Sequence, residues 1–207
     1  MQPLEKRLPN LAFMISMTMS EENEFVRLAY VKRMIKAKNN AVIEKMAIHE
    51  TNSMIKEEMA RNSYCLNLFL NDKDSFVRAA VVSTGFGLSK LAKSDESLAV
   101  KQAIIKYGYP EKRYFKDPDL QVIAALAEYG FINDDDAYRY DDLIRMIVAE
   151  KTNHPEKFSK DTGPCVRRTV AKRGYNHKIF AYDTCTGVRE AAKEAIIKSF
   201  MNTMENL

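Results

Sequence analysis

The stretch DKDSFVRAAVVSTGF at residues 72–86 has four close copies elsewhere in the chain. Every copy opens with Asp and carries Val five residues later, and the first four end in Gly followed by an aromatic residue. The other copies are DESLAVKQAIIKYGY (95–109), DPDLQVIAALAEYGF (117–131), DTGPCVRRTVAKRGY (161–175) and DTCTGVREAAKEAII (183–197). A pattern that returns every 22 or 23 residues, with one double gap of 44, predicts a stacked-repeat architecture.

The middle of each copy predicts an amphipathic helix. Val77, Ala80 and Val81 stand at i, i+3 and i+4, which places them on one helical face. The small residue in this set lets neighbouring helices approach closely. We expect the opening Asp, such as Asp72, to be the helix N-cap, and Pro118 suits the first helical position.

The end of each copy predicts a turn and then a second, shorter helix. Gly85 can adopt the left-handed conformation that stops a helix, and the aromatic residue after it, Phe86, is expected to plug the core. Leu88 and Leu91 then supply an apolar segment before the next Asp. One repeat is therefore expected to contain a helix of about three turns, a Gly turn and a short helix.

Three weaker copies extend the pattern. RYDDLIRMIVAEKTN (139–153) fills the double gap, although Thr152 replaces its Gly. Upstream lie ETNSMIKEEMARNSY (50–64) and EENEFVRLAYVKRMI (21–35). The two upstream copies are 29 residues apart, so an extra turn or helix is expected between them.

Together the copies predict an all-α fold, an α-α superhelix (solenoid) of seven to eight 22-residue repeats. The expected organisation is one domain over residues 1–207. It would consist of an irregular N-terminal cap at 1–49, regular repeats at 50–197 and a C-terminal cap at 198–207, since the end repeats of a stack are usually atypical.

The pattern D-x-D-x-x-V-R-x-x-V-A-x-x-G-Y resembles HEAT-like repeats and the related leucine-rich-repeat-variant units. The resemblance covers residues 50–197 well and 20–49 poorly. It implies a curved stack of helices that serves mostly as a protein-binding scaffold. A minority of such families bind nucleic acid, including DNA glycosylases for alkylated bases, and similar units occur in uncharacterised proteins of bacteria and their viruses. The variant prototype carries a cysteine cluster for an iron–sulfur centre; this chain has no such cluster, and no cofactor is inferred.

The bulk composition is that of a globular protein. Of 207 residues, 46% are hydrophobic and 29% charged, and the net charge of +4 allows nucleic-acid binding without requiring it. The three cysteines are odd in number and have no metal-binding spacing, which predicts reduced thiols and a cytoplasmic location. No apolar run reaches the length of a membrane span, so no membrane association is expected.

A basic residue follows the conserved Val position in seven copies. This basic row consists of Arg27, Lys56, Arg78, Lys101, Arg145, Arg167 and Arg189. Stacking would align these side chains into a surface for phosphates or for an acidic protein face. The alternative is that each cation pairs with the opening Asp of its own or a neighbouring repeat, which we favour. Ile123 interrupts the row, where a continuous nucleic-acid track would keep a cation.

A second candidate surface is the acidic loop INDDDAYRYDD at 132–142. Its candidate binding residues are Asp134, Asp135, Asp136, Tyr138 and Tyr140. The segment 116–150 holds three Lys/Arg and nine Asp/Glu, whereas 151–180 holds eight and two. Such opposed blocks attract complementary surfaces and could drive head-to-tail homo-oligomers. The loop is either a solvated connection or an acidic lip that contacts a protein or mimics nucleic acid.

The stretch RRTVAKRGYNHK at 167–178 is the third candidate. Arg168, Lys172, Arg173 and Lys178 are expected on the outer face of one repeat, close to Tyr175. Basic residues interleaved with aromatics suit contacts with a nucleic-acid backbone and bases, although a charge-rich outer helix face is the commoner reason for such a pattern.

No catalytic or metal-binding set is predicted. The histidines and cysteines are scattered, and no phosphate loop, nucleophile elbow or paired carboxylate appears. The sequence therefore favours a non-enzymatic module that binds a protein partner through the basic row and the acidic loop. Nucleic-acid binding is the alternative, followed by a small mobile-element inhibitor that occludes a nucleic-acid-binding partner. A HEAT-like DNA glycosylase is the nearest enzymatic alternative.

Overall fold

The structure is a computed structural model that describes residues 23–205. The described residues are helical with no strand, which confirms the all-α prediction. The first 22 residues, which include much of the predicted N-terminal cap, lie outside the described part of the chain. The chain divides into two compact units, Met1–Glu111 and Lys112–Leu207.

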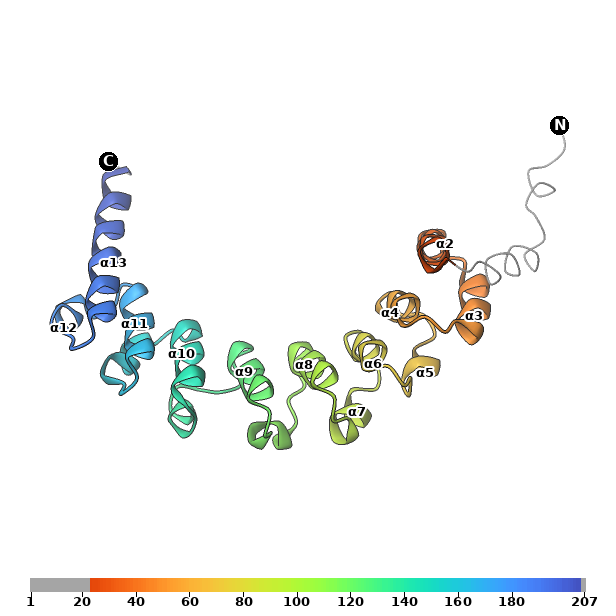
Figure 1. Ribbon diagram of the computed structural model, residues 1–207, viewed down its shortest axis with the longest axis horizontal. Helices are drawn as coiled ribbons and strands as arrows, with labels where there is room; N and C mark the ends of the chain where they lie inside the picture. The colour runs from red at the N-terminus through yellow and green to blue at the C-terminus, as the bar shows by residue number, and fades with distance from the viewer. Residues whose placement is uncertain (1–22, 206–207) are drawn as a thin grey trace. The chain divides into compact units, whose positions relative to one another are not determined.

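In the N-terminal unit, longer helices alternate with shorter ones. The longer helices pack in chain order, α2 on α4, α4 on α6 and α6 on α8 (Figure 1). The shorter helices lie to one side of this row (Figure 1). The elements are α2 (Glu24–Lys36), α3 (Asn40–His49), α4 (Ser53–Arg61), α5 (Leu66–Phe69), α6 (Ser75–Val82), α7 (Leu88–Ser94) and α8 (Leu98–Tyr107).

The C-terminal unit repeats this alternation. Its longer helices pack in the order α9, α10, α11 and α13, and the connecting segments are mostly single 3-10 turns. The elements are η2 (Lys112–Lys116), α9 (Leu120–Glu128), η3 (Asp136–Arg139), α10 (Asp142–Lys151), η4 (Pro155–Lys160), α11 (Pro164–Lys172), α12 (His177–Phe180) and α13 (Thr186–Glu205). The predicted second short helix is thus confirmed for copies in both units.

The conserved apolar positions form the core. The repeated Val is completely buried in five copies, namely Val77, Val100, Val122, Val166 and Val188. Burial of one such side chain stabilises the fold by about 1.5–3 kcal/mol. The prediction for the aromatic after each Gly holds only in part: Phe86 is half-buried and packs against the core, whereas Tyr109 and Tyr175 are each 39% exposed. Aromatics of the shorter elements, such as Phe69 of α5 and Phe158 of η4, are more completely buried.

The glycine stops are confirmed. The four glycines that end the longer helices have φ between +76° and +95°, in the left-handed region that glycine adopts without steric cost. Gly108 is itself the C-cap of α8. The turn into the shorter helix therefore depends on the absence of a side chain at these positions.

The opening Asp is not the N-cap that we predicted. The cap of α6 is Asp74, two residues later, and its side chain accepts the backbone N–H of Phe76. In α9 the cap is Asp119, so Pro118 precedes the helix rather than starting it. The opening Asp72 instead accepts the backbone N–H of Asp74 at 2.9 Å, which orients its carboxylate.

The two irregular ends of the pattern have simple structural causes. The longer spacing upstream lengthens the second helix, since α3 has 10 residues where α5 has four. At the other end α13 runs for 20 residues and includes most of the predicted C-terminal cap. Among the described residues, no helix combines the length and apolar composition needed to cross a bilayer.

Candidate functional site

The basic row ties successive repeats together. Each basic residue is the fourth residue of its longer helix, which we call the basic position, and the opening residue three positions before each longer helix is the acidic position. Arg78 of α6 donates from Nε and Nη2 to the carboxylate of Asp95 at 2.6 and 3.1 Å. Its Nη1 donates at 2.8 Å to the backbone oxygen of Asp72 in its own repeat. One guanidinium thus connects the starts of two consecutive repeats.

The same geometry recurs twice in the C-terminal unit. Arg145 donates to both oxygens of Asp161 at 2.8 and 3.0 Å, and Arg167 donates to both oxygens of Asp183 at 2.7 and 2.9 Å. The Nη1 atoms again donate to backbone oxygens, of Tyr140 and of Asp161. Two parallel bonds between a guanidinium and a carboxylate fix orientation as well as distance.

These ion pairs are shielded from water. The Asp161 side chain is 1% exposed and that of Arg145 is 13% exposed. The hydrogen bond from Arg167 lowers the pKa of the Asp183 carboxyl below its ordinary value, and the bond to Asp95 raises the pKa of Arg78. Removing one partner of a buried pair costs about 3–5 kcal/mol, because the other charge is left uncompensated.

The row is therefore engaged within the chain. Three further members contact a carboxylate, in the pairs Arg27–Glu50 (3.2 Å), Lys56–Asp72 (2.8 Å) and Lys101–Glu96 (3.0 Å). Among the described residues Arg189 is the member with no carboxylate partner. The ion-pair interpretation of the row is thus the one that the geometry supports, and it leaves few of these cations available to a ligand.

The interruption at Ile123 has a matching change across the junction between α9 and α10. Ile123 holds the basic position of α9 and is 5% exposed. The acidic position before α10 is held by Arg139, whose side chain is 79% exposed and contacts Asp136 at 3.2 Å. The basic position therefore lacks its cation and the acidic position lacks its anion. Because both are missing, neither position leaves a buried ion without its partner.

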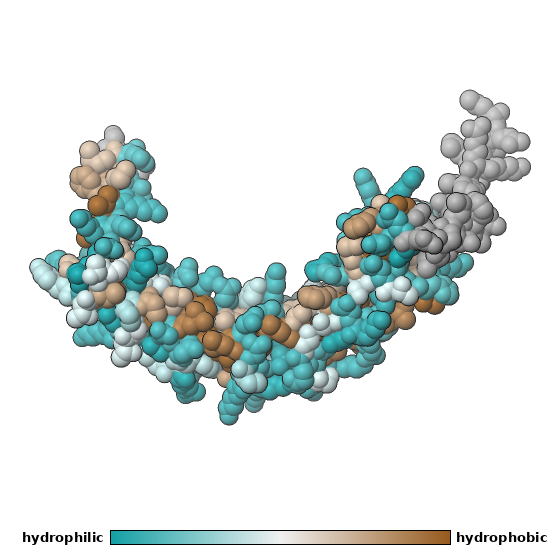
Figure 2. All heavy atoms as spheres, viewed as in Figure 1, coloured by the Kyte–Doolittle hydropathy of each residue, from teal (hydrophilic) through white to brown (hydrophobic). Residues whose placement is uncertain are grey.

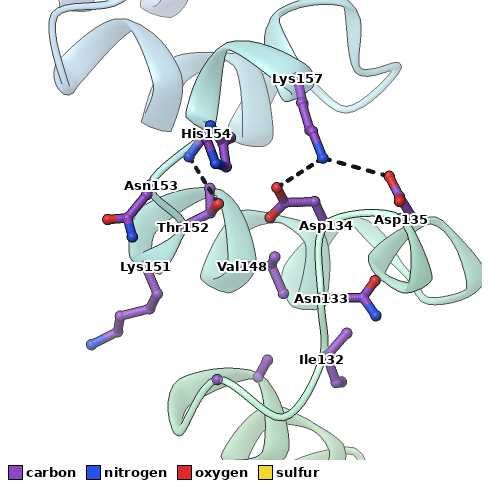
Figure 3. Close-up of a pocket in the computed structure, with 12 residues that line it drawn as sticks. Ile132, Asn133, Asp134, Asp135, Val148, Lys151, Thr152, Asn153, His154 and Lys157 are labelled. Atoms are coloured by element: carbon purple, nitrogen blue, oxygen red, sulfur yellow. Dashed lines mark hydrogen bonds and ion pairs between the residues drawn. The ribbon is translucent and has the colours of Figure 1, made fainter.

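The acidic loop is folded rather than simply solvated. It contains η3, and Lys157 contacts the carboxylates of Asp134 at 3.3 Å and Asp135 at 3.7 Å (Figure 3). The hydrogen bond to Asp134 is the main reason that the pKa of Lys157 is raised. Asp136 accepts from the side chain of Asn133 at 2.8 Å. A pocket of about 340 Å³ lies between this loop and residues 148–157.

The two loop tyrosines anchor the loop. Tyr138 stacks on Phe158 with ring centroids 5.4 Å apart, and its hydroxyl donates to the backbone oxygen of Lys157 at 3.2 Å. The Tyr140 hydroxyl donates to the backbone oxygen of Phe115 at 3.3 Å. Burial raises the pKa of both phenols above the ordinary value for tyrosine. Of the three central aspartates, Asp135 is the most open, with a side chain 91% exposed.

The basic stretch at 167–178 divides into structural and exposed residues. Arg173 donates from Nη1 to the backbone oxygens of Ala149 and Thr152, at 2.8 and 2.7 Å, and so satisfies carbonyls at the end of α10. Its guanidinium lies 5.8 Å from the ring centre of Tyr175. Three cations are exposed and form no ion pair with the described residues, namely Arg168, Lys172 and Lys178.

The histidines and cysteines do not converge. The described residues contain no group of three His, Cys, Asp or Glu side chains that could hold a metal ion. Burial raises the pKa of the thiols of Cys65 and Cys165, and the Cys165 thiol donates to Asp142 at 3.3 Å. Protonated thiols are poor nucleophiles and poor metal ligands.

The sequence reasoning missed an exposed apolar position. The second residue of α2, α4 and α6 is Phe25, Met54 and Phe76, and their exposed fractions are 65%, 40% and 63%. The signal was present in the repeat, but it is recognisable only once the helix start is known.

Comparison with known proteins adds no assignment. No family model, curated protein or solved structure matches the chain.

Proposed function

We propose that this chain is a non-enzymatic α-solenoid of HEAT-like repeats that binds a protein partner. Among the described residues the proposal counts seven two-helix repeats, from α2 with α3 to α11 with α12, followed by α13. Support comes from the hydrogen-bond pattern shared by Arg78, Arg145 and Arg167 and from the packing of longer helices in chain order. Repeats joined in this way leave one face of every longer helix to carry ligands.

The observation that carries the proposal is the exposed row of Phe25, Met54 and Phe76. These side chains hold the same position on three helices that pack side by side, and packed helices are separated by about 8–10 Å. The spacing makes them one apolar strip rather than isolated exposed residues. Contiguous exposed apolar surface marks protein interaction sites, and aromatic and Met side chains are the enriched types there.

The acidic loop is a separate polar contact in this proposal. Lys157 already neutralises much of Asp134, but the Asp135 carboxylate is almost fully exposed. An exposed charge of this kind contributes to association rate and partner choice more than to affinity. Loss of Asp135 should therefore slow binding without abolishing it.

Affinity capture from the native host tests the function. The full chain should retain a protein partner after nuclease treatment, and the double variant Phe25→Ser, Phe76→Ser should lose it. Leu68→Ser is the matched control, because Leu68 lies in α5, is 52% exposed and belongs to no such row. Equal capture by the double variant, confirmed to be folded by circular dichroism, would remove the apolar strip from the proposal.

The exposed cations Arg168, Lys172 and Lys178 support nucleic-acid binding as a second candidate function. Neutralising all three should weaken binding to single-stranded or duplex nucleic acid at low salt and reduce the salt dependence of the affinity. Electrophoretic mobility shifts over a salt series measure both quantities. Absence of binding by the unmodified chain at low salt would dismiss this candidate.

A further inference from the structure

The backbone orients the guanidinium of Arg189 as it orients that of Arg167, but the described residues supply no carboxylate to Arg189. It occupies the basic position of α13, and its Nη1 donates to the backbone oxygens of Asp183 and Thr184 at 2.6 and 3.1 Å. Arg167 makes the same two bonds one repeat earlier, to the oxygens of Asp161 and Thr162. The backbone thus fixes both guanidiniums in the same way.

The Nε and Nη2 edge of the guanidinium is bonded differently in Arg167 and Arg189. In Arg167 the Nε and Nη2 atoms donate to the Asp183 carboxylate. In Arg189 the Nη2 atom donates to the hydroxyl of Thr186 at 2.8 Å, and Nε has no acceptor among the described residues. A guanidinium edge oriented in advance by the backbone is a specific receptor for an Asp or Glu side chain, because little conformational entropy is lost on binding.

The same helix presents an uncovered apolar face. The buried residues of α13 are confined to its first half, at Val188, Ala191 and Ala192. Ile196 and Phe200 follow Arg189 by seven and eleven residues, which places all three on one side of the helix. Their exposed fractions are 47% and 68%.

Adjoining residues widen this face. Ile197, Met201 and Met204 are 50%, 56% and 60% exposed. Figure 2 shows hydrophobic colour at the C-terminal end of α13. The cation and the apolar face form one surface, which we call the α13 face and define as Arg189, Ile196, Ile197, Phe200, Met201 and Met204.

We propose that the α13 face docks a helix of another protein, and that this helix is preceded by an Asp or Glu three residues before its start. The helix would sit on α13 as α13 sits on α11, with its carboxylate on Arg189 as Asp183 is on Arg167. Its apolar side would cover Ile196 and Phe200. The inference rests on the proposed function only in taking a protein as the ligand, and it concerns a different surface.

A second copy of this chain is a poorer occupant. Five acidic positions pair with a cation of the same chain, namely Glu50, Asp72, Asp95, Asp161 and Asp183. Each of these carboxylates would have to leave its own cation to reach Arg189 of another copy. Exchanging one shielded ion pair for another gives no net gain, whereas a partner with a free carboxylate forms a new pair.

A displayed library of helical peptides as long as α13 tests the proposal on the immobilised full chain. The library varies the residue three before the helix start and the apolar face. Enriched peptides should carry Asp or Glu at that residue. Their affinity should fall about tenfold for Arg189→Gln and about tenfold for Phe200→Ser, as expected for loss of one charge-assisted contact or one aromatic anchor.

Matched variants separate the possible failures. Lys198→Gln removes an exposed charge half a turn around α13 from Arg189 and should leave the acidic preference of the peptides unchanged. Phe200→Ser leaves the Arg189 hydrogen bonds intact. Its peptide affinity therefore tests the α13 face even if the Arg189→Gln variant unfolds. The variant Phe25→Ser, Phe76→Ser should bind the peptides normally, which keeps this test independent of the apolar strip.

Three results would overturn the proposal. The first is failure to enrich peptides, and the second is enrichment without an acidic preference. The third is self-association of the full chain in sedimentation velocity that Phe200→Ser abolishes, because that result assigns the α13 face to a second copy.

Discussion

Ile123 and Arg139 face the same junction, between α9 and α10, and both lack the charge that the equivalent positions carry at the neighbouring junction between α10 and α11. There Arg145 and Asp161 form a shielded pair with 13% and 1% of their side chains exposed. At the junction between α9 and α10, buried Ile123 and exposed Arg139 stand where that pair would be, and neither leaves an unpaired buried charge. The two changes are therefore expected to be energetically coupled.

Ile123→Arg combined with Arg139→Asp should restore the missing ion pair. Ile123→Arg alone should destabilise the chain, because it places a cation in a buried position with no carboxylate, whereas Arg139→Asp alone should have little effect. The double variant should recover about 1–3 kcal/mol relative to the sum of the single changes. Urea unfolding of all four proteins measures this coupling, and purely additive effects would contradict the assigned register.

Loss of one buried carboxylate should be costly. Asp161→Asn leaves Arg145 without its counter-ion and should lower the free energy of unfolding by about 3 kcal/mol or more. Asp135→Asn is the control, since that side chain is 91% exposed and should change stability by less than about 1 kcal/mol. Chemical denaturation compares the two, and similar costs would show that the Asp161 pair is not a principal stabilising contact.

The pair of Asp183 and Arg167 should make stability depend on acid. Because the hydrogen bond from Arg167 lowers the pKa of Asp183 in the folded chain, folding favours the charged carboxylate. The stabilisation is fully present above the unfolded pKa of about 3.9 and is lost as the pH falls through the lower folded value. The stability difference between the native chain and Asp183→Asn should be constant from pH 7 to about pH 5 and shrink below about pH 4.

Urea titrations across this pH range measure that difference. Other carboxylates also titrate in the acidic range, but they contribute to both proteins and cancel in the comparison. A difference that grew as the solution became more acidic would reverse the expected sign and exclude the assigned pKa shift.

Gly108 tests the backbone conformation of the turns. Its φ is +95°, and a Cβ placed there would meet nothing within 4 Å, so a substitution is strained by conformation and not by crowding. Gly108→Ala should cost about 1–2 kcal/mol, and Gly108→Asn should cost less because Asn tolerates left-handed conformations. Thermal unfolding distinguishes the variants, and an unchanged midpoint for Gly108→Ala would argue against the left-handed turn.

The local features of each repeat could be predicted from the sequence. The Val position, the helical segments and the glycine stops follow from periodicity and from the conformational freedom of glycine, which act over one or two turns of chain. The pattern Asp-x-Asp left the helix start ambiguous, because either Asp72 or Asp74 is chemically able to cap. The expected start of α6 was therefore two residues early, and Phe76 is recognisable as its second residue only once Asp74 is known to be the cap.

The sequence by itself determined an all-helical chain with a repeated apolar face, a repeated cation and a repeated acid. Only the tertiary structure decided which acid meets which cation, because Arg78 and Asp95 are 17 residues apart and meet only when consecutive repeats pack. Packing likewise buried Phe158 completely and left Tyr175 39% exposed. Among the described residues it also left Arg189 bonded to backbone oxygens and to the Thr186 hydroxyl but to no carboxylate.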